Sequence, residues 1–123
     1  MTTKKGALYK FWSSFGLPAY NEQSVPEGAE LPYITYEVSE AAFGERINLS
    51  ASIWSRSTSW AFNDKKLNEI SEEIGRTGKF IDYDKGCLWI LRGVPFGTSA
   101  GDLNDSAVKR TIINIMAEFE SAN

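Results

Sequence analysis

Residue types alternate strictly over residues 47–57, and this alternation limits the folds open to the chain. One side of this segment is apolar apart from its last member and carries Ile47, Leu49, Ala51, Ile53 and Ser55. The other side is polar around one large aromatic residue and carries Asn48, Ser50, Ser52, Trp54 and Arg56. Because successive side chains of a strand point to opposite faces, only one face of this strand can join a core. The pattern therefore predicts an antiparallel sheet with one solvated side.

Three further segments have the composition of strands. Residues 33–38 alternate, and Lys79–Tyr83 and residues 87–92 flank the short connection Asp84-Lys85-Gly86. We expect these last two segments to form a hairpin in which Gly86 supplies the positive φ of a bulged turn.

The segment 108–119 fits two structures. Read as a helix, its apolar stripe is Val108, Ile112, Ile115 and Phe119. Read as a strand, one face carries Thr111, Ile113, Ile115, Ala117 and Phe119. The run of β-branched residues favours the strand, because such residues lose rotamer freedom in a helix.

Two segments show helical periodicity. In residues 3–15, Leu8, Phe11, Trp12 and Phe15 recur at helical spacing, Thr2 or Thr3 can cap the start, and Gly16 stands at the end. In residues 60–74 the stripe is Trp60, Leu67, Ile70 and Ile74, the serines of residues 57–59 offer N-caps, and Gly75 follows.

These segments predict an α+β fold in the order α-β-β-α-β-β-β. We expect one domain over residues 1–123, in which two helices cover one face of a mostly antiparallel sheet. Two turn-rich stretches, residues 17–32 and 93–105, are predicted to be loops. Loops of this length in a compact domain are often functional.

The composition argues against most catalytic chemistry. The chain has no histidine and one cysteine, Cys87. It therefore lacks the ligands of an ordinary zinc site and the base of a serine triad. Asp82, Asp84 and Asp102 leave a small carboxylate-based hydrolase as an alternative, although turns recruit Asp for local hydrogen bonds. We expect no enzymatic activity, no metal and no cofactor.

Charge and hydropathy limit the partners. Thirteen basic and sixteen acidic residues give a net charge of −3, which does not favour direct nucleic-acid binding. Lys4, Lys5 and Lys10 are the basic concentration on which a nucleic-acid module would have to depend. No apolar run approaches the roughly 20 residues that cross a bilayer, so we expect no membrane contact. No apolar segment follows the first lysines, so we expect synthesis in the cytoplasm.

The aromatic residues fall into two groups. Phe11, Trp12, Phe15 and Trp60 lie on helical stripes and are predicted to be core. Trp54 lies instead on the polar face of its strand. Trp89 lies opposite Leu88 and Ile90, so that its strand is apolar on both sides. Large exposed aromatics tend to anchor interfaces.

The chain resembles the tail-terminator, or tail-completion, proteins at the head–tail junction of long-tailed bacteriophages. The resemblance starts with residues 11–20 (Phe-Trp-Ser-Ser-Phe-Gly-Leu-Pro-Ala-Tyr), Val25-Pro26 and residues 31–36 (Leu-Pro-Tyr-Ile-Thr-Tyr). It continues in residues 53–59 (Ile-Trp-Ser-Arg-Ser-Thr-Ser), Leu88-Trp89, residues 92–96 (Arg-Gly-Val-Pro-Phe) and a terminal apolar strand.

This resemblance implies an α+β subunit that forms a ring, a hexamer, on the end of the finished tail tube. Its partners would be other copies of itself, the tail tube protein and the head connector protein, and its place would be the neck of the virion. Another neck component, such as a stopper or head-completion protein, is the near alternative. The candidate interface residues are Trp54, Arg56, Trp89, Phe96, Asp102 and Asp105.

Overall fold

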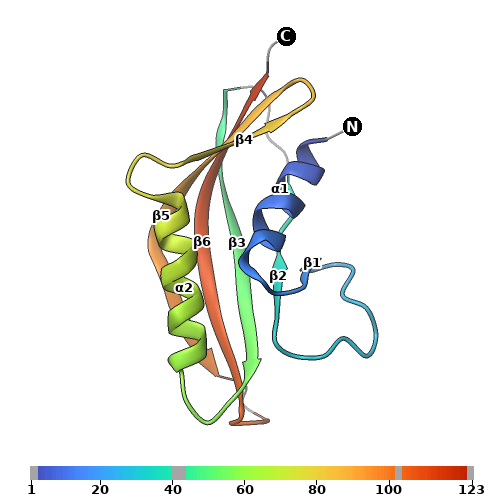
Figure 1. Ribbon diagram of the computed structural model, residues 1–123, viewed down its shortest axis with the longest axis vertical. Coiled ribbons are helices and arrows are strands. Elements are labelled where there is room, and N and C mark those ends of the chain that lie inside the picture. The colour runs from blue at the N-terminus through green and yellow to red at the C-terminus, as the bar shows by residue number, and fades with distance from the viewer. Residues whose placement is uncertain (1–2, 40–43, 102–103, 122–123) are drawn as a thin grey trace.

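The computed structural model describes residues 3–39, 44–101 and 104–121. It contains helix α1 (Lys4–Trp12), a 3-10 turn (Ser13–Phe15) and helix α2 (Ala61–Ile74). The strands are β1 (Ala19–Asn21), β2 (Tyr33–Tyr36), β3 (Arg46–Arg56), β4 (Lys79–Tyr83), β5 (Gly86–Gly101) and β6 (Val108–Ser121). The fold therefore mixes α and β structure, as predicted, with two helices and a curled six-stranded sheet (Figure 1).

The first helix has the capping that its sequence predicts. Thr3 Oγ1 accepts a hydrogen bond of 3.0 Å from the Gly6 N–H, and Gly16 takes φ of +80° after the 3-10 turn. The apolar stripe is buried, with Phe11 and Trp12 in edge-to-face contact at 4.8 Å between ring centroids. This aromatic stripe anchors α1 to the core.

The second helix differs from the prediction at its start. Trp60 is the N-cap residue and makes no side-chain capping bond, while Ser59 Oγ accepts from the Ala61 N–H at 3.0 Å. Trp60 is half-buried rather than core, whereas Ile70 and Ile74 are fully buried. The prediction placed Trp60 on the apolar stripe, but this position precedes the first helical residue.

A buried amide ties α2 to the centre of the sheet. Asn63 is fully buried, and its Oδ1 accepts from Ser55 Oγ at 2.6 Å. Its Nδ2 donates to Ile53 O at 3.3 Å and to Thr111 Oγ1 at 3.2 Å. Because a buried amide is costly unless its groups are bonded, this network fixes how α2 lies across β3 and β6.

The sheet has the order β1-β2-β3-β6-β5-β4. β1 and β2 are parallel, and every other neighbouring pair is antiparallel. β6 settles the helix-or-strand ambiguity in favour of the strand. The face predicted for a strand is the one in the core, with Thr111, Ile113, Ile115, Ala117 and Phe119 all buried.

Two predicted loops contain strand. β1 lies within residues 17–32, so the element order is α-β-β-β-α-β-β-β. β5 continues through most of residues 93–105, where Gly97–Gly101 pair with β6 after a register shift between Arg92 and Gly97. The sequence was misleading because Gly93 and Pro95 mark a break in the ladder, not the end of the strand.

The turn between β4 and β5 also differs in detail. Gly86 pairs directly with Tyr83, which leaves Asp84 and Lys85 as the two turn residues. Gly86 does not take a positive φ, so the bulge predicted there is wrong. The hairpin itself is confirmed.

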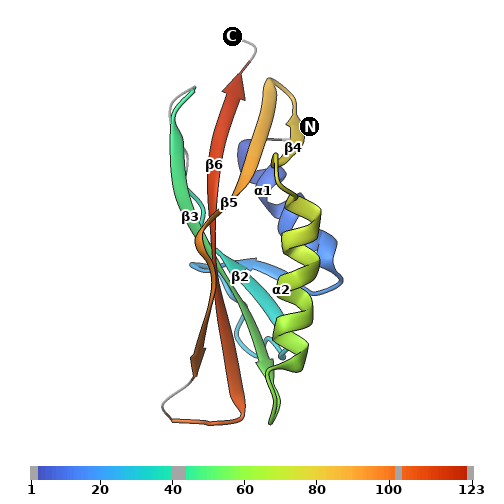
Figure 2. The same cartoon turned by 90° about the vertical axis from the view of Figure 1, so that its left-hand side faces the viewer.

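The helices do not both cover one face of the sheet as predicted. α2 packs on β3, β6 and β5, whereas α1 packs mainly on β4 and β1. Those two strands are the opposite ends of the sheet order, so the sheet curls and α1 lies between its edges (Figures 1 and 2). The prediction assumed an open sheet and could not foresee this curl.

Candidate interaction surface

The strand residues that point away from α2 form a surface that we call the outer face. In Figure 2 the helices lie to the right of β3, β6 and β5, and no helix lies on the left of these strands. Two groups of aromatic and charged side chains occupy its ends. The lower cluster, near the end of β3, comprises Tyr33, Thr35, Ser52, Trp54 and Arg110. The upper cluster, near the start of β3, comprises Arg46, Phe80, Trp89 and Glu118.

The lower cluster is locked by polar contacts. Trp54 Nε1 donates to Thr35 Oγ1 at 2.9 Å, and the Arg110 guanidinium lies 4.7 Å from the Trp54 ring centroid. Arg110 Nε donates to Ser52 Oγ at 3.0 Å. Register explains the grouping, because Tyr33, Trp54 and Arg110 are direct cross-strand neighbours. Trp54 is therefore a fixed, half-buried side chain with a cation on its ring.

The upper cluster is more open. Phe80 and Trp89 stack with 5.5 Å between centroids and an interplanar angle of 2°, and the Arg46 guanidinium lies 5.2 Å from the Trp89 ring. Arg46 also pairs with Glu118 at 3.4 Å. Trp89 Nε1 donates to Thr77 O at 2.9 Å. Phe80, on the edge strand β4, remains 59% exposed, so this cluster presents an apolar surface to solvent.

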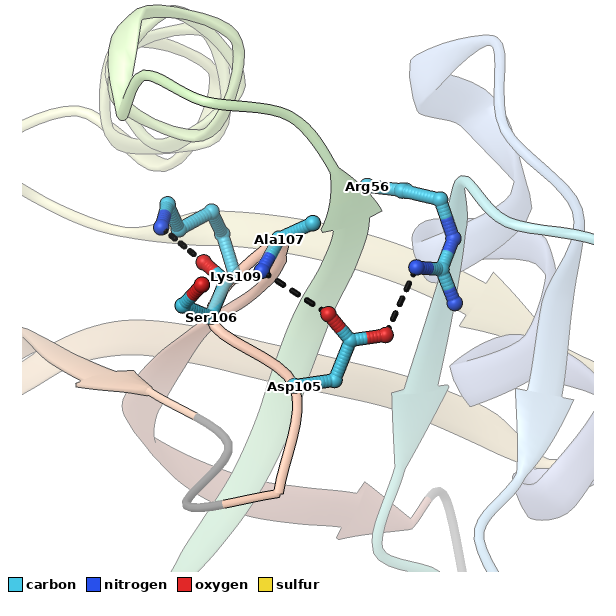
Figure 3. A network of polar contacts seen from close by, with 5 residues as sticks. All are labelled: Arg56, Asp105, Ser106, Ala107 and Lys109. Atoms are coloured by element: carbon cyan, nitrogen blue, oxygen red, sulfur yellow. Dashed lines mark hydrogen bonds and ion pairs between the residues drawn. The ribbon is translucent and has the colours of Figure 1, made fainter.

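An ion pair fixes the turn that leads into β6. Asp105 Oδ2 accepts from Arg56 Nη1 at 2.7 Å, and its Oδ1 accepts from the Ala107 N–H at 3.0 Å (Figure 3). Lys109 Nζ donates to Ser106 O in the same turn. The bond from Arg56, with that from Ala107, holds the pKa of Asp105 below its ordinary value of 3.8. The pair joins the end of β3 to the start of β6.

A hollow adjoins the lower cluster. It has a volume of about 600 Å³ and is lined by Tyr33, Trp54, Arg56, Val108 and residues 29–31. A second hollow of about 340 Å³ shares Leu31 and Arg56 with the first. The part of the outer face next to Trp54 is therefore concave.

The structure brings three of the six predicted interface residues together. Trp54 and Arg56 lie on β3, and Asp105 lies beside Arg56. Trp89 lies at the opposite end of the sheet, in the upper cluster. Phe96 lies in the irregular part of β5 and packs partly against the core. The prediction for Asp102 falls outside the described residues.

Sequence reasoning missed the partners of both tryptophans. Phe80 lies opposite Trp89 across β4 and β5, and Arg110 lies opposite Trp54 across β6 and β3. The alternation of β4 could have placed Phe80 on the face opposite Ile81. The cross-strand partners depend on the register of the strands, which cannot be read from the sequence.

Two of the three acidic residues considered for hydrolysis lie at the surface, and the third, Asp102, falls outside the described residues. Asp82 and Asp84 are exposed, on β4 and in the turn that follows it. Asp82 and Glu120 lie opposite Cys87 in the ladder. Burial, with the charges of Glu120 and Asp82, raises the pKa of the Cys87 thiol. Within the described ranges, no three His, Cys, Asp or Glu side chains are grouped so as to hold a metal ion.

Comparison with known proteins returned no match to a family model, to a curated protein or to a solved structure. None of the helices in the described part of the chain has the length and apolar character needed to span a membrane.

Proposed function

We propose that this chain is a structural subunit of the neck of a long-tailed bacteriophage, a tail terminator that forms a ring on the end of the tail tube. The ring, a hexamer in the resembling proteins, would stop tube growth and offer a surface to the head connector protein. In this role the chain makes and breaks no covalent bond. Its partners are other copies of itself, the tail tube protein and the connector.

The observation that carries the proposal is the outer face, with a fixed aromatic cluster at each end. Interfaces are enriched in Trp, Tyr, Phe and Arg, and residues held rigid before contact lose less entropy on binding. Trp54 and Trp89 each have an arginine over the ring and a hydrogen bond from the indole N–H. Such preorganised aromatic residues are suited to contact with another protein.

The sequence resemblance supports the same role. Trp54 and Arg56 belong to the resembling segment 53–59, and they lie beside the hollow at the lower end of the outer face. Trp89 belongs to the resembling pair Leu88-Trp89 and stacks on the exposed Phe80. The resembling segments therefore include residues on both clusters of the outer face.

The test is to delete the gene from the phage that encodes it and to image the particles by negative-stain electron microscopy. Tubes longer than those of the parent phage, restored to normal length by the gene in trans, support a terminator. Tails of normal length that fail to join heads would point to a stopper or head-completion protein instead. Unchanged virions that contain none of the protein would refute the proposal.

A further inference from the structure

The lower half of β5 is an unpaired sheet edge. β4 pairs with β5 only from Gly86 to Ile90. Beyond the register shift, Gly97–Gly101 pair with β6 on one side, and no strand of the described chain pairs with them on the other. Figure 2 views the molecule from this side. α2 packs on the inner face of the sheet, where its Leu67 lies close to Gly97.

The direction of the backbone groups on this edge follows from the ladder. The Ser57 N–H donates to Ala107 O, so odd-numbered residues of β6 turn their backbone groups toward β3. Even-numbered residues of β6 then turn their backbone groups toward β5. There they lie opposite Thr98 and Ala100, whose backbone groups point back toward β6. The N–H and C=O groups of Gly97, Ser99 and Gly101 therefore point away from β6. Three residues offer donors and acceptors for another strand.

This edge lacks the usual protection against pairing. Natural edge strands are kept apart by charges, prolines, short length or a covering element. The edge strand β4 carries Lys79 and Asp82 and lies against α1. Residues 97–101, Gly-Thr-Ser-Ala-Gly, contain neither a charge nor a proline. Their small side chains also permit close approach of another backbone.

The other end of the same sheet offers a matching edge. The register gives one continuous row across five strands: Tyr20, Thr35, Ser52, Ile112 and Thr98. β1 ends this row on one side and β5 ends it on the other. Hydrogen bonds from Ile34 N to Pro18 O and from Glu22 N to Tyr36 O turn Pro18, Tyr20 and Glu22 toward β2, so that Ala19 and Asn21 face outward.

The two edges also run in compatible directions. β3 is antiparallel to β6 and to β2, β1 is parallel to β2, and β5 is antiparallel to β6. Therefore β1 runs opposite to β5. A second copy placed beside the first in the same orientation would bring its β1 against β5 as an antiparallel neighbour. Such a contact joins two different surfaces, so repetition by rotation closes a ring.

We propose that the β5 edge, residues 97–101, pairs with β1 of a second copy of this chain, so that the sheet continues from one subunit to the next. If the row of cross-strand neighbours continues into the second copy at the same level, Thr98 lies opposite Tyr20 of that copy. Backbone pairs then form between Ser99 and Ala19 and between Gly97 and Asn21, whose C=O accepts this bond beside the one from the Ser24 N–H at 2.8 Å. This inference rests on the proposed function, because it names the contact that would close the ring.

The register makes a crosslinking test possible. In a Cys87→Ser background, Thr98→Cys and Tyr20→Cys are combined in one full-length chain and oxidised at high protein concentration. Thr98 and Tyr20 of neighbouring copies would be a non-hydrogen-bonded pair with Cα atoms about 4.5 Å apart, within disulfide range. In one chain β2, β3 and β6 lie between them, a path of roughly 19 Å along the sheet, so an internal bridge is excluded.

The expected result is a ladder of dimers, trimers and larger products on a non-reducing gel, which a reductant collapses to monomer. Neither single cysteine variant should give products beyond dimer. A ladder absent from the double variant would overturn the proposal. So would dimers from Thr98→Cys alone in equal yield, because they would show β5 paired with β5 about a two-fold axis.

A second variant guards against a folding defect. Gly101→Lys adds a charge to the edge at a site where a Cβ meets no atom within 4 Å. Its circular-dichroism spectrum should match that of the parent, as expected for a surface substitution, while its mass in solution falls toward that of the monomer. An unchanged oligomer mass would contradict the proposal.

Failure of this inference can be told from failure of the proposed function. If gene deletion gives over-long tails but the double cysteine variant gives no ladder, the protein is a terminator whose ring contact lies elsewhere. If the double variant gives a ladder but the deletion leaves tails of normal length, the β5–β1 contact is supported and the terminator function is refuted.

Discussion

The two halves of β5 differ in what holds them in the sheet. In the upper half, Gly86–Ile90 lie between β4 and β6, and Leu88 and Ile90 are fully buried. In the lower half, Gly97–Gly101 have β6 alone as a neighbour, and Thr98 and Ser99 are exposed. Side-chain burial holds the upper half, whereas backbone pairing with β6 holds the lower. The lower half therefore keeps free the backbone groups that a partner can use.

The largest expected effect contrasts core and edge in this strand. Leu88→Ala removes a fully buried side chain and should lower the free energy of unfolding by about 2–5 kcal/mol. Thr98→Ala, on the exposed lower half, should change it by no more than about 0.5 kcal/mol. Urea unfolding followed by circular dichroism measures both. An equal loss in the free energy of unfolding at the two positions would show that the two halves are held in the same way.

A pair of glycines tests where the lower half touches the body. A Cβ on Gly97 would lie 2.6 Å from Leu67 Cδ2, whereas a Cβ on Gly101 meets no atom within 4 Å. Gly97→Ala should therefore cost about 1–3 kcal/mol through overpacking, and Gly101→Ala should cost almost nothing. Thermal unfolding of the two variants gives the comparison. A smaller cost for Gly97→Ala in a Leu67→Ala background would identify the clash as the cause.

The upper cluster should contribute a smaller amount to stability. Phe80→Ala removes the ring stacked on Trp89 but little buried area, because Phe80 is 59% exposed. We expect a loss of about 0.5–1.5 kcal/mol in the free energy of unfolding. Phe80→Leu, which keeps an apolar side chain without the ring, serves as the control. A loss above 3 kcal/mol would show that this half of the outer face belongs to the core.

The smallest effect on stability is expected from the Arg56–Asp105 ion pair in the turn that precedes β6. The pKa of Asp105 is lowered when folded, so its bond to Arg56 stabilises the turn above pH 3.8 and is lost as the pH falls through the folded value. A carboxyl titration followed by NMR should place the Asp105 pKa below 3.8. Arg56→Ala should raise it toward that value. An Asp105 pKa above 3.8 in the parent protein would show that the bond is not formed in solution.

The sequence predicts best where side chains decide the structure. The alternation of residues 47–57 and the β-branched run near Ile113 predicted β3 and the strand form of β6, because those residues must bury one face. Residues 97–101 are small, and all but Thr98 have little β-propensity, so the pairing with β6 is what makes them a strand. β1 is likewise made by pairing with β2. The two edges on which the proposed contact depends are therefore the parts of the sheet that could not be predicted from the sequence.

The candidate site was predictable in its parts but not in its arrangement. Trp54 is exceptional on a polar face, and its unusual position indicated a surface role. Its partners Thr35 and Arg110 come from strands that are 19 and 56 positions away in sequence, and the register that unites them is set by the whole sheet. The positions of Arg56 and Asp105 were likewise known only as a strand end and a turn.

Hydrogen–deuterium exchange of residues 97–101 reports on the β5–β1 contact itself, when the dilute protein is compared with the assembled form. We expect the amides of Thr98 and Ala100 to be protected in both samples, since they face β6. The amides of Gly97 and Ser99 should exchange rapidly in the dilute protein and become protected on assembly. Rapid exchange of these two amides in both samples would show that the β5 edge does not pair with β1.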